Sequence, residues 1–259
     1  MHKLLTLFFV VLFSISSAVA DDIRFVQISD VRFDAHQNQN LLHKAVLEIN
    51  KQKGIDFVVF TGDNINKPTE ENLEGFLSEV KKLNPPFYIV LGDKDINKSK
   101  EMSKKEYLRI VNKRVRKHKY LEPNYLFEKR GVVFIVADGS KEVIPSTNGF
   151  YKDSVLNFVA NSLNSCKKNN VIIFQHFPLV PPINKETYYT FKPEEYLKIL
   201  YTHHNVKAIV AGHFGVNSEV HKNGITHITT AGLPYYRVID VLDCETENPI
   251  IWTVLKKFE

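Results

Sequence analysis

The fold is decided by residues 57–63, which read FVVFTGD. Four apolar residues in a row predict a strand that is buried on both faces, as in a parallel sheet. The Gly-Asp pair that follows predicts a sharp turn with the carboxylate of Asp63 at its tip. Residues 89–95, IVLGDKD, repeat the arrangement and place Asp93 after a second buried run. The sequence therefore predicts neighbouring parallel strands that end in carboxylates.

Helical patterns alternate with these strands. Residues 41–52 and 69–82 each carry an apolar stripe at helical spacing, on either side of the strand at 57–60. With a first strand at 23–28 and a third at 87–91, the order is strand, helix, strand, helix, strand. This order predicts an α/β fold with parallel strands and right-handed crossovers.

The second half of the chain continues the alternation less regularly and then becomes mostly β. The further predicted elements are helices at 103–118, 152–164 and 193–201, and strands within 127–137 and at 171–174, 206–211, 219–221, 226–230, 236–242 and 250–254. Because no internal repeat or low-complexity linker occurs, we expect a single domain over residues 21–259.

The first twenty residues have the composition of an export signal. A basic start with Lys3 precedes an apolar run over residues 4–15 and the small residues that end at Ala20. The run is shorter than the roughly 20 residues that a membrane-spanning helix needs. We therefore expect a signal peptide at 1–20, cleavage after Ala20, and a secreted or periplasmic protein. A retained membrane anchor is the alternative, and no later stretch is long and apolar enough to span a membrane.

The charge distribution gives little support for a nucleic-acid partner, and the cysteine content leaves the question of a disulfide open. The net charge is +5, and much of the basic excess lies in residues 98–119, which predicts a solvated helix face that also attracts anions. No zinc-finger spacing or aromatic RNA-binding signature accompanies it, so the chain has no clear nucleic-acid module. Cys166 and Cys244 are the only cysteines. Export would permit a disulfide between them, but two separate thiols fit the sequence equally well.

Five strand ends carry a side chain that can bind a metal ion. They are Asp30, Asp63, Asp93, His176 and His213. Because the carboxyl ends of parallel strands line one crevice, we expect these five side chains to converge. Three carboxylates in one place repel one another unless a cation lies between them. Carboxylates together with imidazoles suit zinc, iron or manganese.

The order of these motifs resembles the calcineurin-like metallophosphoesterase family. That family reads Asp-x-His, Gly-Asp-x-x-Asp, Gly-Asn-His-Asp/Glu, an isolated His, and Gly-His-x-His. The resemblance runs from Asp30 to His213 and into the β-rich tail. It implies a central β-sandwich flanked by helices, in four layers (αββα). It also implies two metals that share one Asp and a water or hydroxide, which attacks the phosphorus of a phosphate ester.

The match to the family pattern is incomplete. Arg32 and Lys94 stand where the first and third motifs have His, and Gly215 replaces the second His of the last motif. The later Asp of the second motif is Asn66, and Asp93 replaces the family's Asn. The third motif therefore loses the His that the family uses to help the leaving group.

These losses fall on one of the two metals. By the resemblance, one ion would keep only Asp30 and Asp63, whereas the other would keep a complete set of four ligands. That set is Asp63, Asp93, His176 and His213. We therefore expect one divalent ion, manganese, iron or zinc, with two ions as the alternative.

Arg32 and Lys94 add two positive charges near the depleted metal position. In one interpretation Arg32 replaces the metal electrostatically, by pairing with Asp30 or by gripping a phosphate. In the other, both residues have drifted in a site that no longer works. We assign Asp63, Arg32 and Lys94 as catalytic residues, and Arg32 and Lys94 also as substrate-binding groups that stabilise charge on the phosphoryl oxygens. Because Lys94 is a poor general acid, turnover should be weak or should favour good leaving groups.

The sequence thus predicts a secreted metal-dependent phosphoesterase with a partly degenerate dinuclear site. Its partner would be a phosphate ester or another anionic ligand. The alternative is a weak or inactive pseudo-phosphoesterase that binds a phosphorylated ligand or a partner protein. A purely structural domain would explain the glycines at the strand ends but not the complete ligand set.

Overall fold

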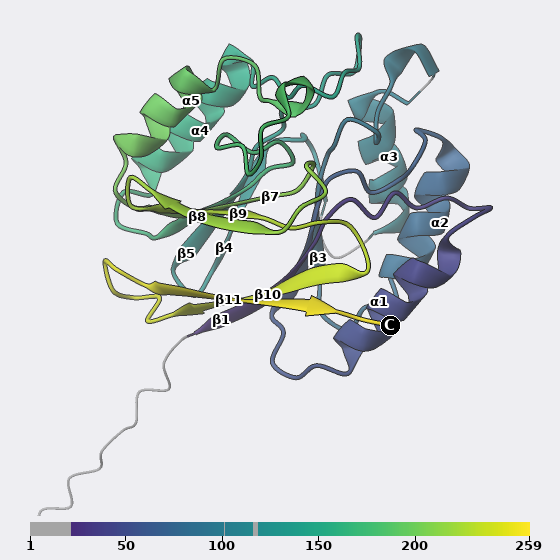
Figure 1. The fold of residues 1–259 in the computed structure, drawn as a ribbon, viewed down its shortest axis with the longest axis horizontal. Coiled ribbons are helices and arrows are strands. Elements are labelled where there is room, and N and C mark those ends of the chain that lie inside the picture. Colours follow the sequence, from purple (N-terminus) through teal and green to yellow (C-terminus); the bar gives the residue numbers. More distant parts are fainter. Residues whose placement is uncertain (1–21, 101, 116–118) are drawn as a thin grey trace, which may run out of the picture.

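The computed structural model describes residues 22–100, 102–115 and 119–259. Two β-sheets face each other, and helices cover their outer faces (Figure 1). This arrangement confirms the predicted α/β sandwich flanked by helices. The predicted signal peptide lies outside the described residues. Within the described ranges, no helix combines the length and apolarity that crossing a membrane requires.

The first sheet has the strand order β11-β10-β1-β2-β3. Its elements and the helices that connect them are β1 (Ile23–Ile28), α1 (Gln39–Asn50), β2 (Phe57–Thr61), α2 (Glu70–Val80), β3 (Phe87–Val90), β10 (Tyr235–Leu242) and β11 (Ile250–Lys257). β1, β2 and β3 are parallel, and β10 and β11 extend the sheet in antiparallel pairing. The strand–helix–strand order predicted for residues 23–91 is therefore confirmed.

The second sheet has the strand order β4-β5-β6-β7-β9-β8. Its elements are β4 (Tyr125–Lys129), β5 (Val132–Val136), α4 (Asp153–Ser165), β6 (Val171–Phe174), α5 (Pro193–Tyr201), β7 (Val206–Ala211), β8 (Ser218–Lys222) and β9 (Ile225–Thr229). The four inner strands run parallel, and β4 and β8 are antiparallel at the two edges. α4 and α5 cover its outer face (Figure 1).

The remaining elements are α3 (Lys104–Arg114) and two short 3₁₀ helices, η1 (Lys98–Lys100) and η2 (Glu186–Tyr188). Side-chain caps begin two of the helices beside the first sheet. The hydroxyl of Thr69 accepts from the backbone of α2, and Ser103 does the same for α3. Each such cap stabilises a helix by about 1 kcal/mol.

Phenylalanine rings fill the space between the two sheets. Phe25 and Phe57 of the first sheet stack with centroids 4.9 Å apart, and Phe57 meets Phe134 of the second sheet edge to face at 5.1 Å. Phe174 stacks on Phe134 at 5.6 Å. Such pairs contribute about 0.5–1.5 kcal/mol each beyond their buried area. The strands that carry the candidate ligands are therefore fixed against each other by large, close-packed side chains.

A buried amide joins the two sheets beneath the strand ends. Gln27 of β1 donates from Nε2 to Thr61 Oγ1 of its own sheet at 3.0 Å and to the carbonyl of Ala211 in the second sheet at 2.7 Å. Its Oε1 accepts from Thr230 at 2.6 Å, and Thr230 in turn accepts from Arg237 of β10. Because every polar atom of this buried amide is bonded, the network fixes the spacing between the sheets.

Candidate metal centre

The carboxyl ends of β1, β2, β3, β6 and β7 meet at one end of the sandwich. The side chains that follow them lie together and are almost completely buried: Asp30, Asp63, Asp93, His176 and His213. The structure thus brings all five sequence-predicted ligands into one cluster. They come from both sheets, because β1 to β3 belong to the first sheet and β6 and β7 to the second.

Two glycines allow this close approach. A Cβ on Gly212 would lie 1.6 Å from Ser29 Oγ, and one on Gly62 would lie 2.5 Å from the ring of His176. Gly62 also has a φ of +91°, which L side chains rarely adopt. The chain can therefore bring β7 against β1, and β2 against His176, only with glycine at these positions.

Four residues of the centre have left-handed backbone angles. The φ values are 48° at Asp30, 48° at Arg32, 52° at Asp63 and 75° at His213. Such angles cost of order 1–3 kcal/mol each in non-glycine residues and gather at functional sites. Backbone bonds hold them, among them Arg32 N to Asp63 O at 2.8 Å.

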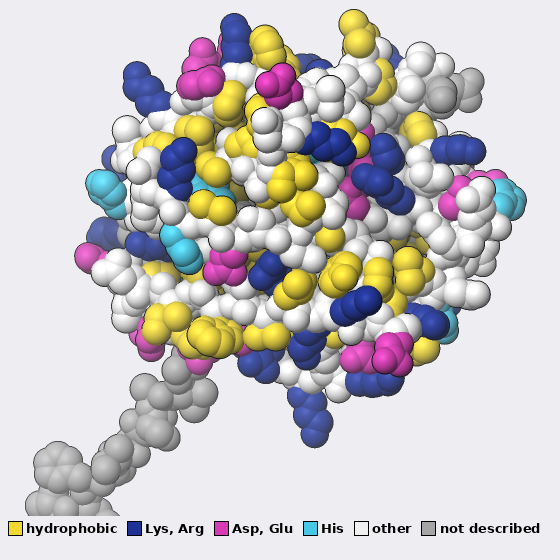
Figure 2. All heavy atoms as spheres, in the orientation of Figure 1, with side chains coloured by type: hydrophobic (Ala, Val, Ile, Leu, Met, Phe, Trp, Pro, Cys, Tyr) yellow, Lys and Arg dark blue, Asp and Glu magenta, His cyan; other side chains and the backbone are white. Residues whose placement is uncertain are grey.

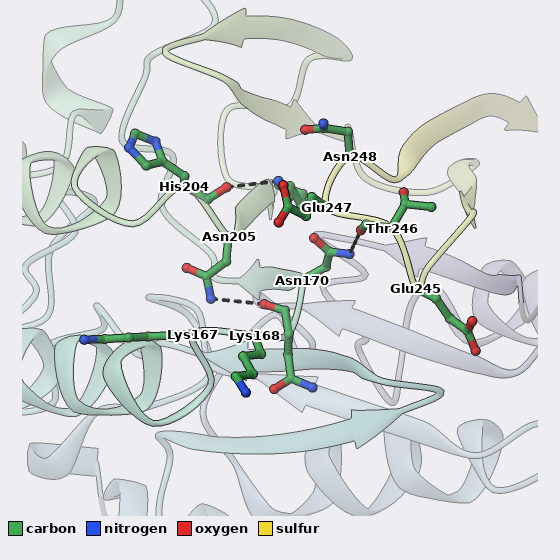
Figure 3. A pocket seen from close by; sticks show the side chains of 11 residues that line it. Lys167, Lys168, Asn170, His204, Asn205, Glu245, Thr246, Glu247 and Asn248 are labelled. Atoms are coloured by element: carbon green, nitrogen blue, oxygen red, sulfur yellow. Dashed lines mark hydrogen bonds between the residues drawn. The ribbon is translucent and has the colours of Figure 1, made fainter.

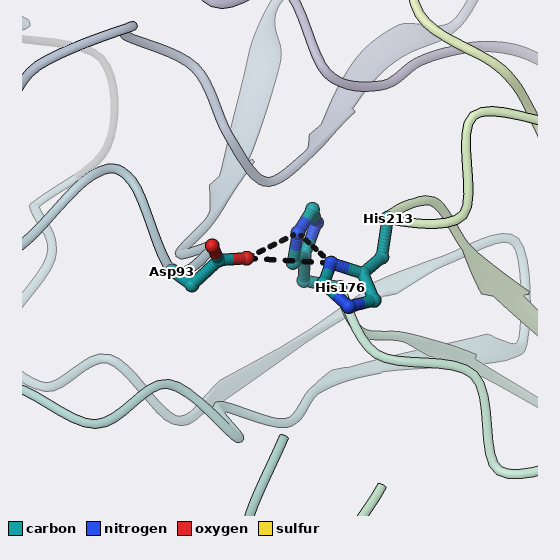
Figure 4. A group of neighbouring side chains, drawn as sticks. All are labelled: Asp93, His176 and His213. Atoms are coloured by element: carbon teal, nitrogen blue, oxygen red, sulfur yellow. Dashed lines mark hydrogen bonds and ion pairs between the residues drawn. The ribbon is translucent and has the colours of Figure 1, made fainter. Parts of the chain in front are cut away.

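One half of the centre consists of Asp93, His176 and His213 (Figure 4). Asp93 Oδ1 lies 3.4 Å from His176 Nε2 and 3.3 Å from His213 Nδ1, and the two ring nitrogens are 3.1 Å apart. His176 Nδ1 lies 2.7 Å from the carbonyl of Thr61. Because a carbonyl only accepts, Nδ1 carries a proton, and Nε2 is the ring nitrogen that faces Asp93. A carbonyl that fixes a histidine in this way is typical of metal sites.

This half has the properties of a cation site. The ligand atoms of its three residues all lie within 4.8 Å of one another, as do those of Asp30, Asp63 and His176. Asp93 Oδ1 and His213 Nε2 are buried without a hydrogen-bond partner. Orphaned buried polar atoms are rare and costly, so they need a further group to satisfy them. Asp63 Oδ1, 3.5 Å from His176 Nε2, is placed to contribute a fourth donor.

The other half contains Asp30 and Asp63, and Arg32 already occupies it. Arg32 Nη2 lies 3.0 Å from Asp30 Oδ1, and Nε lies 3.3 Å from Asp63 Oδ2. The second oxygen of Asp30 accepts from Ser29 Oγ at 2.7 Å and from the backbone N–H of His213 at 2.8 Å. The carboxylates of this half therefore have partners from the protein itself.

The charges of the cluster perturb one another. Burial raises the pKa of Asp63, the imidazolium of His176 opposes this, and the carboxylates of Asp93 and Asp30 raise it further, so that the net shift is upward. For Arg32 burial acts to lower the pKa, but Asp30, Asp63 and Asp93 raise it above its usual value. Arg32 is therefore a permanent positive charge between the two carboxylates.

Lys94 is the second cation at the centre. Its Nζ lies 3.6 Å from Asp93 Oδ2 and 4.0 Å from Asp63 Oδ2, and its side chain is 32% exposed. Its backbone N–H donates to Asp63 Oδ1 at 2.9 Å. Lys94 thus reaches the centre from the solvent side, as Arg32 does with a side chain that is 40% exposed.

Two further positions that depart from the family pattern, Asn66 and Gly215, make no hydrogen bond to the candidate ligands through a side chain. Asn66 donates to Asp34 Oδ2 at 3.2 Å rather than to one of the candidate ligands. Gly215 has open space around the position of a Cβ, but its φ is +68°. A side chain at residue 215 would therefore find room at the cost of backbone strain.

Sequence reasoning missed several groups that support the centre. Asp95 is completely buried and accepts from the backbone N–H groups of Asn64, Ile65 and Gly92, which ties the loop after β2 to the loop after β3. Burial raises its pKa to about 7. The sequence did carry a signal for Asp95, because it stands where the family pattern has Asp or Glu at the end of the third motif.

An aromatic side chain also covers one side of the cluster. The ring of Tyr188, in η2, lies 4.7 Å from the ring of His213, and Lys185 Nζ lies 3.4 Å from the centroid of Tyr188. Phe214 approaches Tyr188 at 5.8 Å. The long segment between β6 and α5 therefore supplies an aromatic wall next to the candidate ligand His213.

The cysteines play no part in this centre. Cys166 Sγ donates to the carbonyl of Ser162, and Cys244 Sγ donates to that of Val241. The two residues are not bonded to each other.

A separate cavity of about 450 Å³ lies at the opposite end of the second sheet (Figure 3). Asn170 and Asn205, which directly precede β6 and β7, form part of its wall, and their amides are bonded to backbone carbonyls. None of the predicted site residues lines this cavity.

Comparison of the sequence with models of known protein families identifies the family of this chain. The family model described as calcineurin-like phosphoesterase matches residues 23–217, and the chain belongs to that family. No curated protein sequence matches the chain.

Solved structures share the fold at low sequence identity. A dimetal phosphatase from Danio rerio is 16% identical with a TM-score of 0.67, and the match covers 92% of this chain and 99% of that one. GAP50 of Plasmodium, described as the anchor in the inner membrane complex, is 16% identical with a TM-score of 0.58, covering 92% and 89%. A phosphopantetheinyl hydrolase from Mycobacterium tuberculosis is 12% identical with a TM-score of 0.54, covering 83% and 91%.

Proposed function

We propose that this chain is a metal-dependent phosphoesterase that holds one divalent ion and uses Arg32 in place of a second. The observation that carries the proposal is the contrast within the centre. Asp30 and Asp63 are paired with Arg32, whereas Asp93 Oδ1 and His213 Nε2 are buried without a hydrogen-bond partner. The family supports hydrolysis of a phosphate ester.

The residues that would hold the ion are Asp63, Asp93, His176 and His213. A divalent ion in such a site supplies an acidified water nucleophile and a Lewis acid for the phosphoryl oxygens. The protein orients these donors in advance, because the carbonyl of Thr61 fixes the ring of His176. The burial of all four side chains limits competition from bulk water.

Arg32 and Lys94 would bind the phosphoryl group. Arg32 uses Nε and Nη2 on the two carboxylates, which leaves further N–H donors on its exposed edge. A guanidinium held rigidly by two carboxylates loses little freedom when it binds a phosphate oxygen. Lys94 adds a second positive charge from the same solvent side, and both charges favour the developing negative charge of the transition state.

Leaving-group chemistry is the weak step of this mechanism. The family histidine that helps the leaving group is Lys94 here, and an ordinary lysine ammonium is a poor proton donor. We therefore expect aryl esters, which leave as stable phenolates, to be hydrolysed faster than alkyl esters.

The test is metal content per chain, measured by elemental analysis after incubation with manganese, iron or zinc and removal of loose ions. One equivalent is expected, and His176→Ala and His213→Ala should each lose it. Two equivalents would contradict the role of Arg32. No bound metal would contradict metal-dependent catalysis.

A binding protein without turnover is the second candidate function. The pairing of Arg32 with both Asp30 and Asp63 favours it, because the guanidinium competes with a metal ion for these two carboxylates. Hydrolysis of an aryl phosphodiester at a rate that falls to background in Asp63→Asn would exclude this candidate. Binding of phosphate esters without any hydrolysis would establish it.

We also propose that the chain is exported. The basic start, the apolar run over residues 4–15 and the small residues before Ala20 support this. Expression in a cell with a secretory pathway should yield a mature protein whose first residue is Asp21. A mature protein that still begins at Met1 would contradict cleavage.

A further inference from the structure

The described residues contain four strands at sheet edges, and β11 differs from the other three. β3 has four residues, and the hydroxyls of Tyr120 and Tyr125 bond its backbone at Phe87 and Ile89. β4 and β8 have five residues each, and β8 carries charged side chains on its exposed surface. β11 has eight residues and pairs with β10 without a register shift.

Natural proteins protect open edges with short strands, charges, proline or bulges, because an open edge offers unpaired backbone groups to another strand. The first six residues of β11, from Ile250 to Leu255, have none of these devices, and Pro249 stands just before the strand. The two lysines of the strand, Lys256 and Lys257, stand at its end. This edge is therefore suited to pairing with another strand.

An apolar stripe accompanies the open edge. Ile250, Trp252 and Val254 alternate along β11 and are 53%, 60% and 39% exposed. These three side chains lie on the outer face of the first sheet, the face that α1 covers over the neighbouring strands. Val254 shows this, because it is paired with Val238 of β10, and Val238 belongs to the same hydrophobic core cluster as the buried residues of α1. Hydrophobic side chains gather on this part of the surface, over β11 (Figure 2; compare Figure 1). A tryptophan exposed in this way is typical of an interface.

The charges at the two ends of the strand are of opposite sign. Glu245 and Glu247 precede β11, and Lys256 and Lys257 end it, all four exposed. In an antiparallel pair of two β11 strands centred on Trp252, the two tryptophans lie opposite each other and Ile250 lies opposite Val254. The same register brings Glu247 of each copy near Lys257 of the other. The strand is thus complementary to itself, as an isologous interface requires.

We propose that β11 pairs antiparallel with β11 of a second copy of this chain, so that the first sheets of the two copies form one continuous sheet. The centre lies at the carboxyl ends of β1, β2 and β3 and takes no part in the pairing. Dimerisation through β11 is therefore independent of the proposed activity.

The experiment combines sedimentation velocity with intrinsic fluorescence over a dilution series. Trp252 is the only tryptophan of the chain, so its emission reports directly on this face. We expect a two-chain mass at high concentration with blue-shifted emission, and both should revert together on dilution. A single-chain mass at every concentration would overturn the proposal, as would a two-chain mass with unchanged Trp252 emission.

Two lysine variants locate the interface. Val254→Lys should give a single-chain mass where the unchanged protein is dimeric. Leu47→Lys is the matched control, because Leu47 is 49% exposed on α1, and it should stay dimeric. If Val254→Lys were also dimeric, the interface would not be β11.

Charge reversal tests the register without touching the apolar stripe. Glu247→Lys and Lys257→Glu should each weaken self-association by about tenfold, because like charges then face each other at both ends. An equimolar mixture of the two variants should associate again, since opposite charges meet in the mixed pair. Failure of the mixture to recover would overturn the antiparallel pairing.

Discussion

The two halves of the metal centre differ in what neutralises their carboxylates. In one half Arg32 bonds Asp30 and Asp63 directly. In the other half Asp93 faces two imidazoles, and one of its oxygens has no hydrogen bond. The difference teaches that one set of strand ends can give a protein cation to some of its carboxylates and leave a buried oxygen of another without a hydrogen bond. In the second half the nearest lysine ammonium is that of Lys94, whose Nζ lies 3.6 Å from Asp93 Oδ2.

Replacement of Asp63 should have the largest effect, because this residue belongs to both halves. Asp63→Asn removes the charge that pairs with Arg32 and a donor for the ion. We expect hydrolysis of an aryl phosphodiester to fall by about a thousandfold or more, as loss of a central electrostatic group does in other enzymes. Asp34→Asn is the control, because Asp34 is also buried but lies outside the centre. An unchanged rate in Asp63→Asn would place hydrolysis elsewhere.

Replacement of Arg32 should free the half that contains Asp30 and Asp63 to bind a metal ion. Arg32→His together with Gly215→His should raise the metal content from one ion per chain toward two, because the fixed cation is removed and two donors are added. The left-handed angle at residue 215 should cost about 1–2 kcal/mol of stability. Elemental analysis and a thermal melt measure both effects. Gly215→His alone is the control and should stay near one ion, so a double variant that gains none would show that Arg32 does not occupy a metal position.

Lys94 should have a smaller effect, since it approaches the centre without a short bond to either carboxylate. Lys94→Met should raise the KM for an anionic ester by about two- to fivefold, the loss of one partly solvated ion pair, and change kcat less. Raised salt should weaken binding more in the unchanged protein than in the variant. Lys98→Met, at an exposed position farther along the same loop, should leave KM unchanged. A fall in kcat alone would mean that Lys94 stabilises the transition state without contributing to substrate binding.

Replacement of His227, which lies outside the metal centre, should change the free energy of unfolding and leave turnover unchanged. Burial first, and then the charge of Lys222, lower its pKa to about 4 from an ordinary value of 6.5. The folded protein therefore binds this proton more weakly than the unfolded chain, and its stability falls as the pH drops from 6.5 to 4, by up to roughly 3 kcal/mol. His227→Gln should reduce this acid sensitivity in urea unfolding at pH 7 and pH 4.5. Equal losses in both proteins would assign the sensitivity to other groups.

The buried strands were the easiest elements to predict. The predicted strands at 171–174 and 206–211 coincide with β6 and β7, because every residue but one in them is buried and apolar runs mark such strands clearly. The strand predicted at 250–254 continues to Lys257 as β11. Its last residues pair with β10 although their side chains are exposed, and exposed lysines give no strand signal.

For the candidate site, the sequence predicted which ligands come together but not all of the contacts between them. Convergence of the five ligands follows from strand order, and the pairing of Arg32 with Asp30 had been one of two interpretations of that residue. The second bond of Arg32, to Asp63, depends on left-handed turns at Asp30 and Asp63 that no pattern specified. The carbonyl of Thr61 that orients His176 is a backbone group and leaves no trace in the sequence.

The buried amide of Gln27 has a consequence for hydrogen exchange. Because its donors reach both sheets, the sandwich cannot open beneath the centre without leaving polar atoms unbonded among apolar side chains. The amides of Asp30 and Gly212, which bond the backbone of neighbouring strand ends, should therefore exchange with deuterium only when the whole domain unfolds. Amides of the exposed strand β8 should exchange through local opening, many times faster. The centre should thus lie in the slowest-exchanging part of the protein, although Arg32 and Lys94 reach it from solvent.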